Sequence, residues 1–273
     1  MEVIAAVDGS SAAATVVDVA TAFARRIGAD VIALHARADA RSSVPAVVTD
    51  LAEGRGLALR VLEGPAATAI VDAAVDGDVA AVVLGLRGAE HGKLPGGSTA
   101  MAVVTTVRRP VIVTPPTAHV VGIDRVLVPL EGTEDSTALP RIVGPLARGG
   151  ARIVPLHVFI PSTVPSFWDQ PHHAAPAWSS GFLARFGPPE AEDLWLRCGD
   201  VTDAVLDVVG RAAIDLVALT WTQDITGAHA PVVRALLARS PVPVLLEPRA
   251  GAPDRPAVIR RGQAVNERRT AYV

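Results

Sequence analysis

Residues 3–10 read Val-Ile-Ala-Ala-Val-Asp-Gly-Ser, and residues 126–133 read Val-Leu-Val-Pro-Leu-Glu-Gly-Thr. Each stretch is a short apolar run that ends in an acidic residue, a glycine and a hydroxyl residue. An apolar run of this length, closed by a turn signal, is typical of a strand buried in a parallel sheet. Because the pattern occurs twice, we predict that the chain consists of two tandem copies of one α/β unit.

The residues after the first stretch alternate between helical and strand patterns. Ser10 or Ser11 is expected to cap a first helix, in which apolar residues recur at helical spacing from Val16 to Ile27. Four more strands are then predicted, with helical patterns between them: Val31–His35, Leu57–Leu62, Val79–Leu84 and Val111–Thr114. This alternation predicts a doubly wound, Rossmann-like domain with a five-stranded parallel sheet.

Further landmarks recur in the same order in the second half. Leu34-His35 has a counterpart in Leu156-His157, Gly64 in Gly199, and residues 110–113 in residues 243–246. We therefore predict one domain over residues 1–118 and a second over 123–248. An arginine-rich tail with little apolar periodicity, residues 249–273, is expected to be flexible. The second copy also carries an aromatic insert at 160–190, which is expected to pack on its own domain as a helical flap.

Composition narrows the classes of function. The formal net charge is −3, which does not favour a nucleic-acid surface. The single cysteine, Cys198, excludes an intramolecular disulfide and a cysteine-rich zinc site. Neither a signal peptide nor an apolar run long enough to span a membrane is evident, so we expect a cytoplasmic protein without a membrane partner.

The stretch with the strongest chemical signal is residues 85–99, Gly-Leu-Arg-Gly-Ala-Glu-His-Gly-Lys-Leu-Pro-Gly-Gly-Ser-Thr. Its early glycines, Gly85 and Gly88, allow sharp turns and a close approach of the backbone to a ligand. Gly97, Ser98 and Thr99 open a helix, whose N-terminus suits a phosphate. The alternative is a purely structural role, in which the glycines only form a connecting loop and Ser98 only caps the helix.

Three features together resemble the universal stress protein family over about residues 1–248: Val-Asp-Gly-Ser at 7–10, Leu-His at 34–35 and the Gly-x-x-Gly…Gly-Ser pattern of the loop. The resemblance implies that ATP is bound in the first domain, with Mg²⁺ as a companion ion. The expected nucleotide-binding residues are Asp8, Gly9, Ala36, Gly85, Arg87, Gly88, Gly97, Ser98 and Thr99. It also implies an intramolecular pseudo-dimer, in which strand Val111–Thr114 pairs with Val244–Glu247.

The sequence departs from the family pattern in both copies. Eight residues, 89–96, separate Gly88 from Gly97, where the family has nine. The corresponding stretch of the second copy, 220–227, lacks the early glycines, and its Trp221 and Asp224 would crowd and repel a triphosphate. We therefore expect at most one nucleotide per chain, with a structural role for the second domain.

These expectations favour a stress-response or regulatory protein that binds an adenine nucleotide and is not a vigorous enzyme. No catalytic residue and no metal site of the protein itself is expected. Two alternatives stay open: a non-nucleotide protein-interaction module of the same fold, and a slow ATPase. The protein partner is not identified by the sequence, which also leaves a homodimer of whole chains open.

Overall fold

The computed structural model of the chain describes residues 1–86, 97–132, 140–159, 176–191, 193–226 and 230–249. The first repeat runs β1 (Glu2–Ala6), α1 (Ala13–Ile27), β2 (Asp30–Arg37), α2 (Ala46–Gly54), β3 (Ala58–Glu63), α3 (Ala66–Ala74), β4 (Val79–Gly85), α4 (Gly97–Thr106) and β5 (Val111–Thr114). The second runs β6 (Arg125–Pro129), α5 (Pro140–Arg148), β7 (Arg152–Phe159), α6 (Pro176–Phe186), β8 (Trp195–Cys198), α7 (Val201–Arg211), β9 (Leu216–Trp221), α8 (Ala230–Arg239) and β10 (Val244–Pro248).

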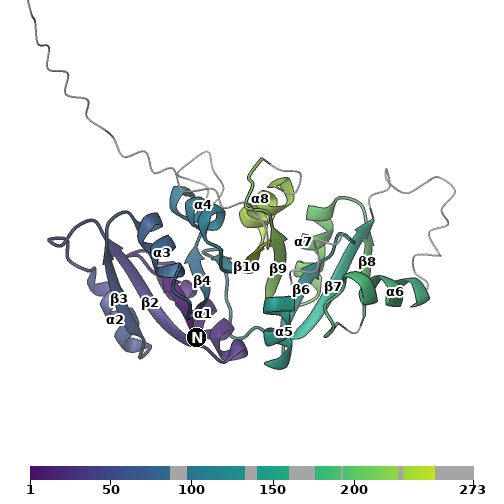
Figure 1. Cartoon of the computed structure of the whole chain (residues 1–273), viewed down its shortest axis with the longest axis horizontal. Coiled ribbons are helices and arrows are strands. Elements are labelled where there is room, and N and C mark those ends of the chain that lie inside the picture. The colour runs from purple at the N-terminus through teal and green to yellow at the C-terminus, as the bar shows by residue number, and fades with distance from the viewer. Residues whose placement is uncertain (87–96, 133–139, 160–175, 192, 227–229, 250–273) are drawn as a thin grey trace, which may run out of the picture.

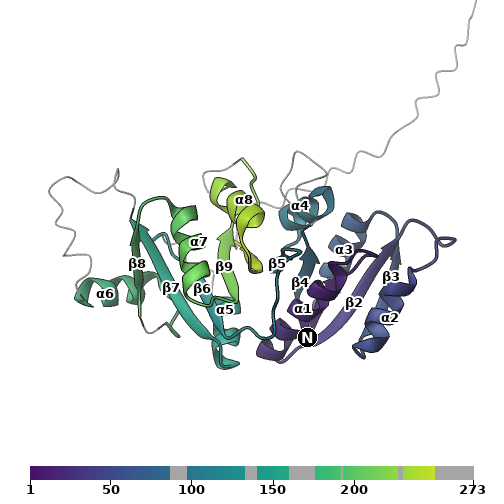
Figure 2. The same ribbon diagram turned by 180° about the vertical axis from the view of Figure 1, so that it is seen from behind.

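Strands of both repeats join in one sheet. Within the described residues the sheet has ten strands in the order β3-β2-β1-β4-β5-β10-β9-β6-β7-β8. Neighbouring strands within a repeat run parallel, as the alternation of strands and helices predicts. Figure 1 shows the first repeat on the left and the second on the right, and Figure 2 shows them exchanged after a half turn. The expected pair of doubly wound domains is confirmed.

The two repeats meet through their last strands. β5 and β10 run antiparallel, with Val113 opposite Val244 and Val111 opposite Leu246. Both strands are buried throughout. The pairing predicted between the fifth strands is therefore confirmed, and it covers two sheet edges that would otherwise expose unpaired backbone groups.

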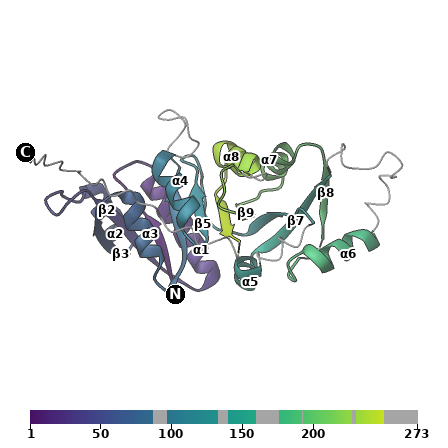
Figure 3. The ribbon, with the colours of Figure 1, turned by 45° about the horizontal axis from the view of Figure 1, so that its top comes forward.

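Each face of the sheet carries a core that continues across the junction between the repeats. One core packs residues of α3 and α4 with residues of α7 and α8, and includes Met101 and Leu236. The other packs α1 and α2 with α5 and α6, and includes Phe23 and Leu146. Figure 3 shows helices on both sides of the sheet in each repeat. Apolar strands that are buried on both faces explain the high fraction of hydrophobic residues.

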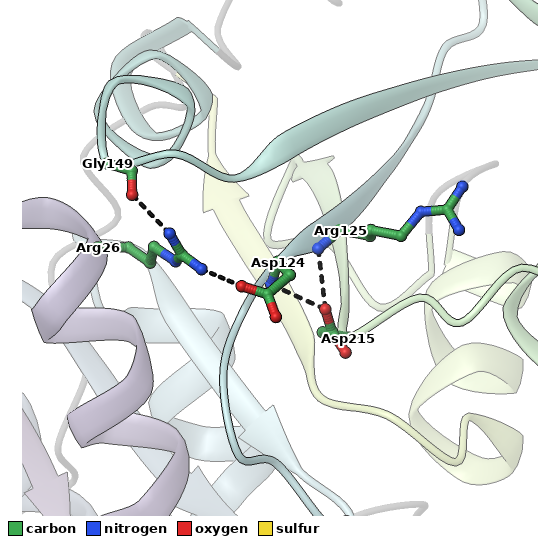
Figure 4. A network of polar contacts seen from close by, with 5 residues as sticks. All are labelled: Arg26, Asp124, Arg125, Gly149 and Asp215. Carbon is green, nitrogen blue, oxygen red and sulfur yellow. Dashed lines mark hydrogen bonds and ion pairs between the residues drawn. The ribbon is translucent and has the colours of Figure 1, made fainter.

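A second contact between the repeats lies where α1 ends (Figure 4). The guanidinium of Arg26 donates from Nη1 to the Gly149 carbonyl at 2.6 Å and forms an ion pair with Asp124. Asp215 in turn accepts from the backbone N–H groups of Asp124 and Arg125, at 2.8 Å each. The α1 terminus is thus tied to the start of β6 and to the turn after α5, so the repeats are joined by polar contacts as well as by the sheet.

The start of α1 differs from the prediction. Its N-cap is Ala12, with no side-chain hydrogen bond, rather than Ser10 or Ser11. The reason is local: the Ser10 N–H donates to the Asp8 carboxylate at 3.0 Å, and the Ser10 carbonyl accepts from the Ala13 N–H at 3.2 Å. These bonds fold residues 8–12 into a turn before the helix begins.

The described part of the aromatic insert contains α6, which packs on its own repeat as expected. The rest of the insert, 160–175, lies outside the described residues. No helix among the described residues is both long and apolar enough to cross a membrane. The predicted tail lies outside the described residues, apart from Arg249.

Candidate nucleotide-binding site

The order of the strands places a crevice in the first repeat. The chain moves from β1 outward to β2 and β3, then returns to the other side of β1 for β4 and β5. In open α/β sheets, ligands bind outside the carboxyl ends of the strands at the point where the order reverses. In this repeat that point lies between β1 and β4, which pair up to Ala6 opposite Leu84. The two stretches that the sequence singled out follow these two strands.

Asp8 and Gly9 form the β1 side of the crevice. The Asp8 Oδ1 accepts the Ser10 N–H, which fixes the carboxylate in the turn. Gly9 faces Pro45 at the start of α2, since a Cβ on Gly9 would lie 3.6 Å from the proline Cβ. α1 then begins without a side-chain cap and without an acidic residue in its first turn. Its N-terminal N–H groups therefore also favour an anion at this edge.

His35 ties β2 to the end of β1. It is buried, and its Nδ1 donates to the Val7 carbonyl at 3.0 Å. In the second repeat the Nδ1 of His157 donates in the same way to the Leu130 carbonyl, at 2.8 Å. The recurrence of the two histidines is therefore structural: each holds the turn that follows the first strand. Ala36, the next residue on β2, is half-buried.

Gly85 ends β4 with its bare backbone against α1. A Cβ at this position would come within 3.3 Å of the Val16 Cγ2. Beside it in the sheet lies Thr114, whose side chain is 1% exposed. The Thr114 hydroxyl has no hydrogen-bond partner among the described residues. Sequence reasoning did not select this residue, because threonine is common in strands.

α4 supplies the helix N-terminus that the loop predicts. It begins at Gly97, where the sequence predicts that the helix opens, and has no acidic residue in its first turn. The Thr99 side chain is exposed there. Arg87 and Gly88 lie outside the described residues. So does the stretch 89–96, which is one residue shorter than in the family pattern. Of the expected site residues, the structure thus brings Asp8, Gly9, Ala36 and Gly85 to the carboxyl edge of the sheet and places Gly97, Ser98 and Thr99 in the first turn of α4.

The turn after β2 brings a fixed negative charge to the same edge of the sheet. The Ser42 hydroxyl and the backbone N–H groups of Ser42 and Arg41 donate to the Asp39 carboxylate, and together they hold its pKa below the usual value. Because the folded state favours the charged form, the stabilisation is present at neutral pH and is lost as the pH falls through this lowered pKa.

In the second repeat, aromatic side chains of α6 cover the turn that follows β6. Gly132, the counterpart of Gly9, has φ +79°, and a Cβ there would lie 2.8 Å from the Phe182 Cε2. Phe182 of α6 is buried, stacks on Trp178 at 5.1 Å between ring centroids, and lies 4.6 Å from the His157 ring. The aromatic insert therefore covers the place that Pro45 borders in the first repeat.

Trp221 has a different role from the one expected. Its side chain is 1% exposed, and its indole N–H donates to the Val104 carbonyl of α4, at 3.2 Å. The ring is therefore packed against the first repeat rather than crowding a ligand in its own. Asp224 accepts from the backbone and hydroxyl of Thr226, which closes a turn after β9.

Comparison with known proteins agrees with this architecture. Residues 48–115 match the model of the universal stress protein family. A universal stress protein from Archaeoglobus fulgidus is 16% identical, and the alignment covers 92% of this chain and 97% of that one with a TM-score of 0.63. A protein of unknown function from Pseudomonas aeruginosa is 11% identical, with 91% and 92% covered and the same TM-score of 0.63.

A third similar structure is a universal stress protein in complex with cAMP. It is 21% identical, with 47% of this chain and 98% of that chain covered and a TM-score of 0.36. No curated protein matches the chain significantly. The predicted resemblance to the universal stress protein family is confirmed: residues 48–115 match the family's model, and the chain as a whole shares the fold of a universal stress protein of known structure.

Proposed function

We propose that this chain, a stress-response protein with the tandem universal stress protein fold, binds one adenine nucleotide in its first repeat. The observation that carries the proposal is the convergence of Asp8, Gly85 and the start of α4 on the strand-order reversal. There the backbone turns sharply and two helices, α1 and α4, begin without acidic residues in their first turns. Such N-termini offer free N–H donors and the positive end of a helix dipole to phosphates.

In this proposal, each part of the nucleotide meets a different part of the crevice. The phosphates lie at the N-terminus of α4, near Ser98 and Thr99, with Arg87, Gly88 and Gly97 in the loop that approaches them. The adenosine lies near Asp8, Gly9 and Ala36. Mg²⁺ enters only as the ion that accompanies the triphosphate. The second repeat has a structural role, because Phe182 covers Gly132 where the first repeat has Pro45 beside Gly9.

The proposal predicts that Ser98→Glu abolishes ATP binding without unfolding the chain. An acidic residue in the first turn of a helix is favourable for the helix dipole, yet its charge repels a phosphate at the same place. We expect no measurable ATP binding by isothermal titration calorimetry, because like charges placed against each other cost several kcal/mol, which lowers the affinity by more than about a hundredfold.

Pro231→Glu is the matched control. Pro231 occupies the corresponding position in the first turn of α8, is exposed, and also lies in a turn without acidic residues. This variant should bind ATP as the wild-type chain does. Equal affinity of Ser98→Glu and wild type would exclude the proposed phosphate position. Absence of ATP binding by the wild type would favour the interaction module, and steady phosphate release that Ser98→Glu removes would favour a slow ATPase.

A further inference from the structure

The turn after β9 makes contacts that the sequence pattern did not anticipate. It occupies, in the second repeat, the place of the glycine loop: Gln223 follows Thr220 as Gly88 follows Gly85. Gln223 has φ +62°, a left-handed conformation that residues other than glycine rarely adopt. The second repeat thus has, at the counterpart of Gly88, a backbone conformation that favours glycine, combined with a long amide side chain.

That amide reaches into the first repeat. The Gln223 Nε2 donates to the Val104 carbonyl at 3.2 Å and to the Val107 carbonyl at 2.7 Å, while its Oε1 accepts from the Arg108 guanidinium at 3.0 Å. The Trp221 indole N–H donates to the same Val104 carbonyl. We refer to Trp221 and Gln223 together as the α4 clasp.

The clasp holds the end of the helix that is opposite to the phosphate position. The last carbonyls of an α-helix have no partner within the helix. Here the Val104 carbonyl in the last turn of α4 accepts from both side chains of the clasp, and the Val107 carbonyl just after the helix accepts from Gln223. α4 has 10 residues, so its two ends are separated by about 15 Å. In all three ribbon views α4 lies beside α8 of the second repeat. A helix that is fixed at its carboxyl end also has a fixed position at its amino end.

We propose that Gln223 is a positioning residue for the nucleotide site, a role that rests on the proposed function. In the second repeat, Phe182 covers Gly132, and residues 221–223 are the counterpart of the start of the glycine loop. In this proposal these residues set the position of α4 in the first repeat. A residue other than glycine keeps a left-handed conformation only where surrounding contacts stabilise it. The hydrogen bonds of the Gln223 side chain to the end of α4 are such contacts. The two repeats are therefore coupled through one helix, and breaking the clasp weakens nucleotide binding about 15 Å away, the length of α4.

The test uses the whole chain and two substitutions at one position. Gln223→Glu keeps the shape and the acceptor for Arg108 but replaces the donor by a carboxylate oxygen that faces two carbonyls. Gln223→Gly removes the side chain and relieves the backbone. We expect both to weaken ATP binding, the first by about tenfold, a typical coupling between sites. Hydrogen exchange of the α4 amides should become faster in both variants, from the carboxyl end of the helix at residue 106 back to residue 101.

Val143→Ala separates positioning from a general loss of stability. Val143 is fully buried in α5 of the second repeat and belongs to the core on the other face of the sheet from α4 and the clasp, so this variant loses core packing there. Its ATP affinity should stay within about twofold of wild type, because its cavity lies outside the core that contains α4. Weakening by Val143→Ala equal to that by Gln223→Glu would overturn the proposal, and so would unchanged ATP affinity of Gln223→Glu.

Hydrogen exchange distinguishes failure of this inference from failure of the proposed function. If the wild-type chain does not bind ATP, the proposed function is wrong, and the exchange of the α4 amides alone decides on the clasp. Faster exchange along the whole helix in Gln223→Glu then supports the positioning role. Exchange that is unchanged, or faster only at residues 104–106, overturns it.

Discussion

Gly149→Ala is expected to destabilise the chain by about 3 kcal/mol, the upper range for forcing a methyl group into a packed site. A Cβ at this position would lie 1.9 Å from the Arg26 carbonyl oxygen and 2.7 Å from the Arg26 carbonyl carbon. Both are backbone atoms in the last turn of α1, so no side chain can rotate to make room. The end of α1 must then move away from the turn after α5, and the hydrogen bond from Arg26 to the Gly149 carbonyl is disturbed as well.

Urea unfolding followed by circular dichroism measures this loss. Gly210→Ala is the matched control, because Gly210 lies in α7 with nothing within 4 Å of a Cβ. Replacing glycine by alanine in an open helical position stabilises by up to about 1 kcal/mol. A stability of Gly149→Ala within about 0.5 kcal/mol of wild type, the usual range of surface substitutions, would show that α1 and α5 do not meet as described.

Trp221→Ala is expected to cost about 4 kcal/mol, as truncation of a fully buried aromatic residue commonly does. The indole is 1% exposed at the junction between the repeats, so its removal leaves a cavity there. It also removes one donor to the Val104 carbonyl, although the Gln223 amide still donates to that oxygen. Most of the loss should therefore come from packing.

Trp221→Phe divides the effect into its two parts. Phenylalanine keeps much of the ring but cannot donate a hydrogen bond, and we expect a cost of about 1–2 kcal/mol, the sum of a small cavity and one lost hydrogen bond. Both variants are compared by urea unfolding. A cost below about 1 kcal/mol for Trp221→Ala would contradict its burial, because a buried Trp→Ala change costs more than that.

Much of the fold could be predicted from the sequence because buried parallel strands have a strong local signature. The runs at 3–7 and 79–84, and their counterparts in the second half, indicated the strands, and the resemblance to the universal stress protein family implied the pseudo-dimer. α5 had no such signature, since Pro145 interrupts its helical pattern. The cap of α1 was wrongly predicted because Asp8 accepts the Ser10 N–H and holds residues 8–12 in a turn, so the helix begins after both serines.

The candidate site could be predicted less completely, because residues far apart in the sequence decide it. Asp8 and Gly85 were found from their positions after strands. The role of Phe182 and of the clasp could not be found in this way, since it depends on which side chains of other elements meet Gly132 and α4. Trp221 was read as an obstacle within its own repeat, whereas the antiparallel junction places it against the other repeat.

Under the proposed function, one of the two repeats holds a nucleotide and the other does not. Native mass spectrometry of the whole chain with excess ATP and Mg²⁺ measures this number, because the added mass counts the bound nucleotides. We expect a single ATP on each wild-type chain and none on Ser98→Glu. Two nucleotides per chain, or one that remains on Ser98→Glu, would contradict the account.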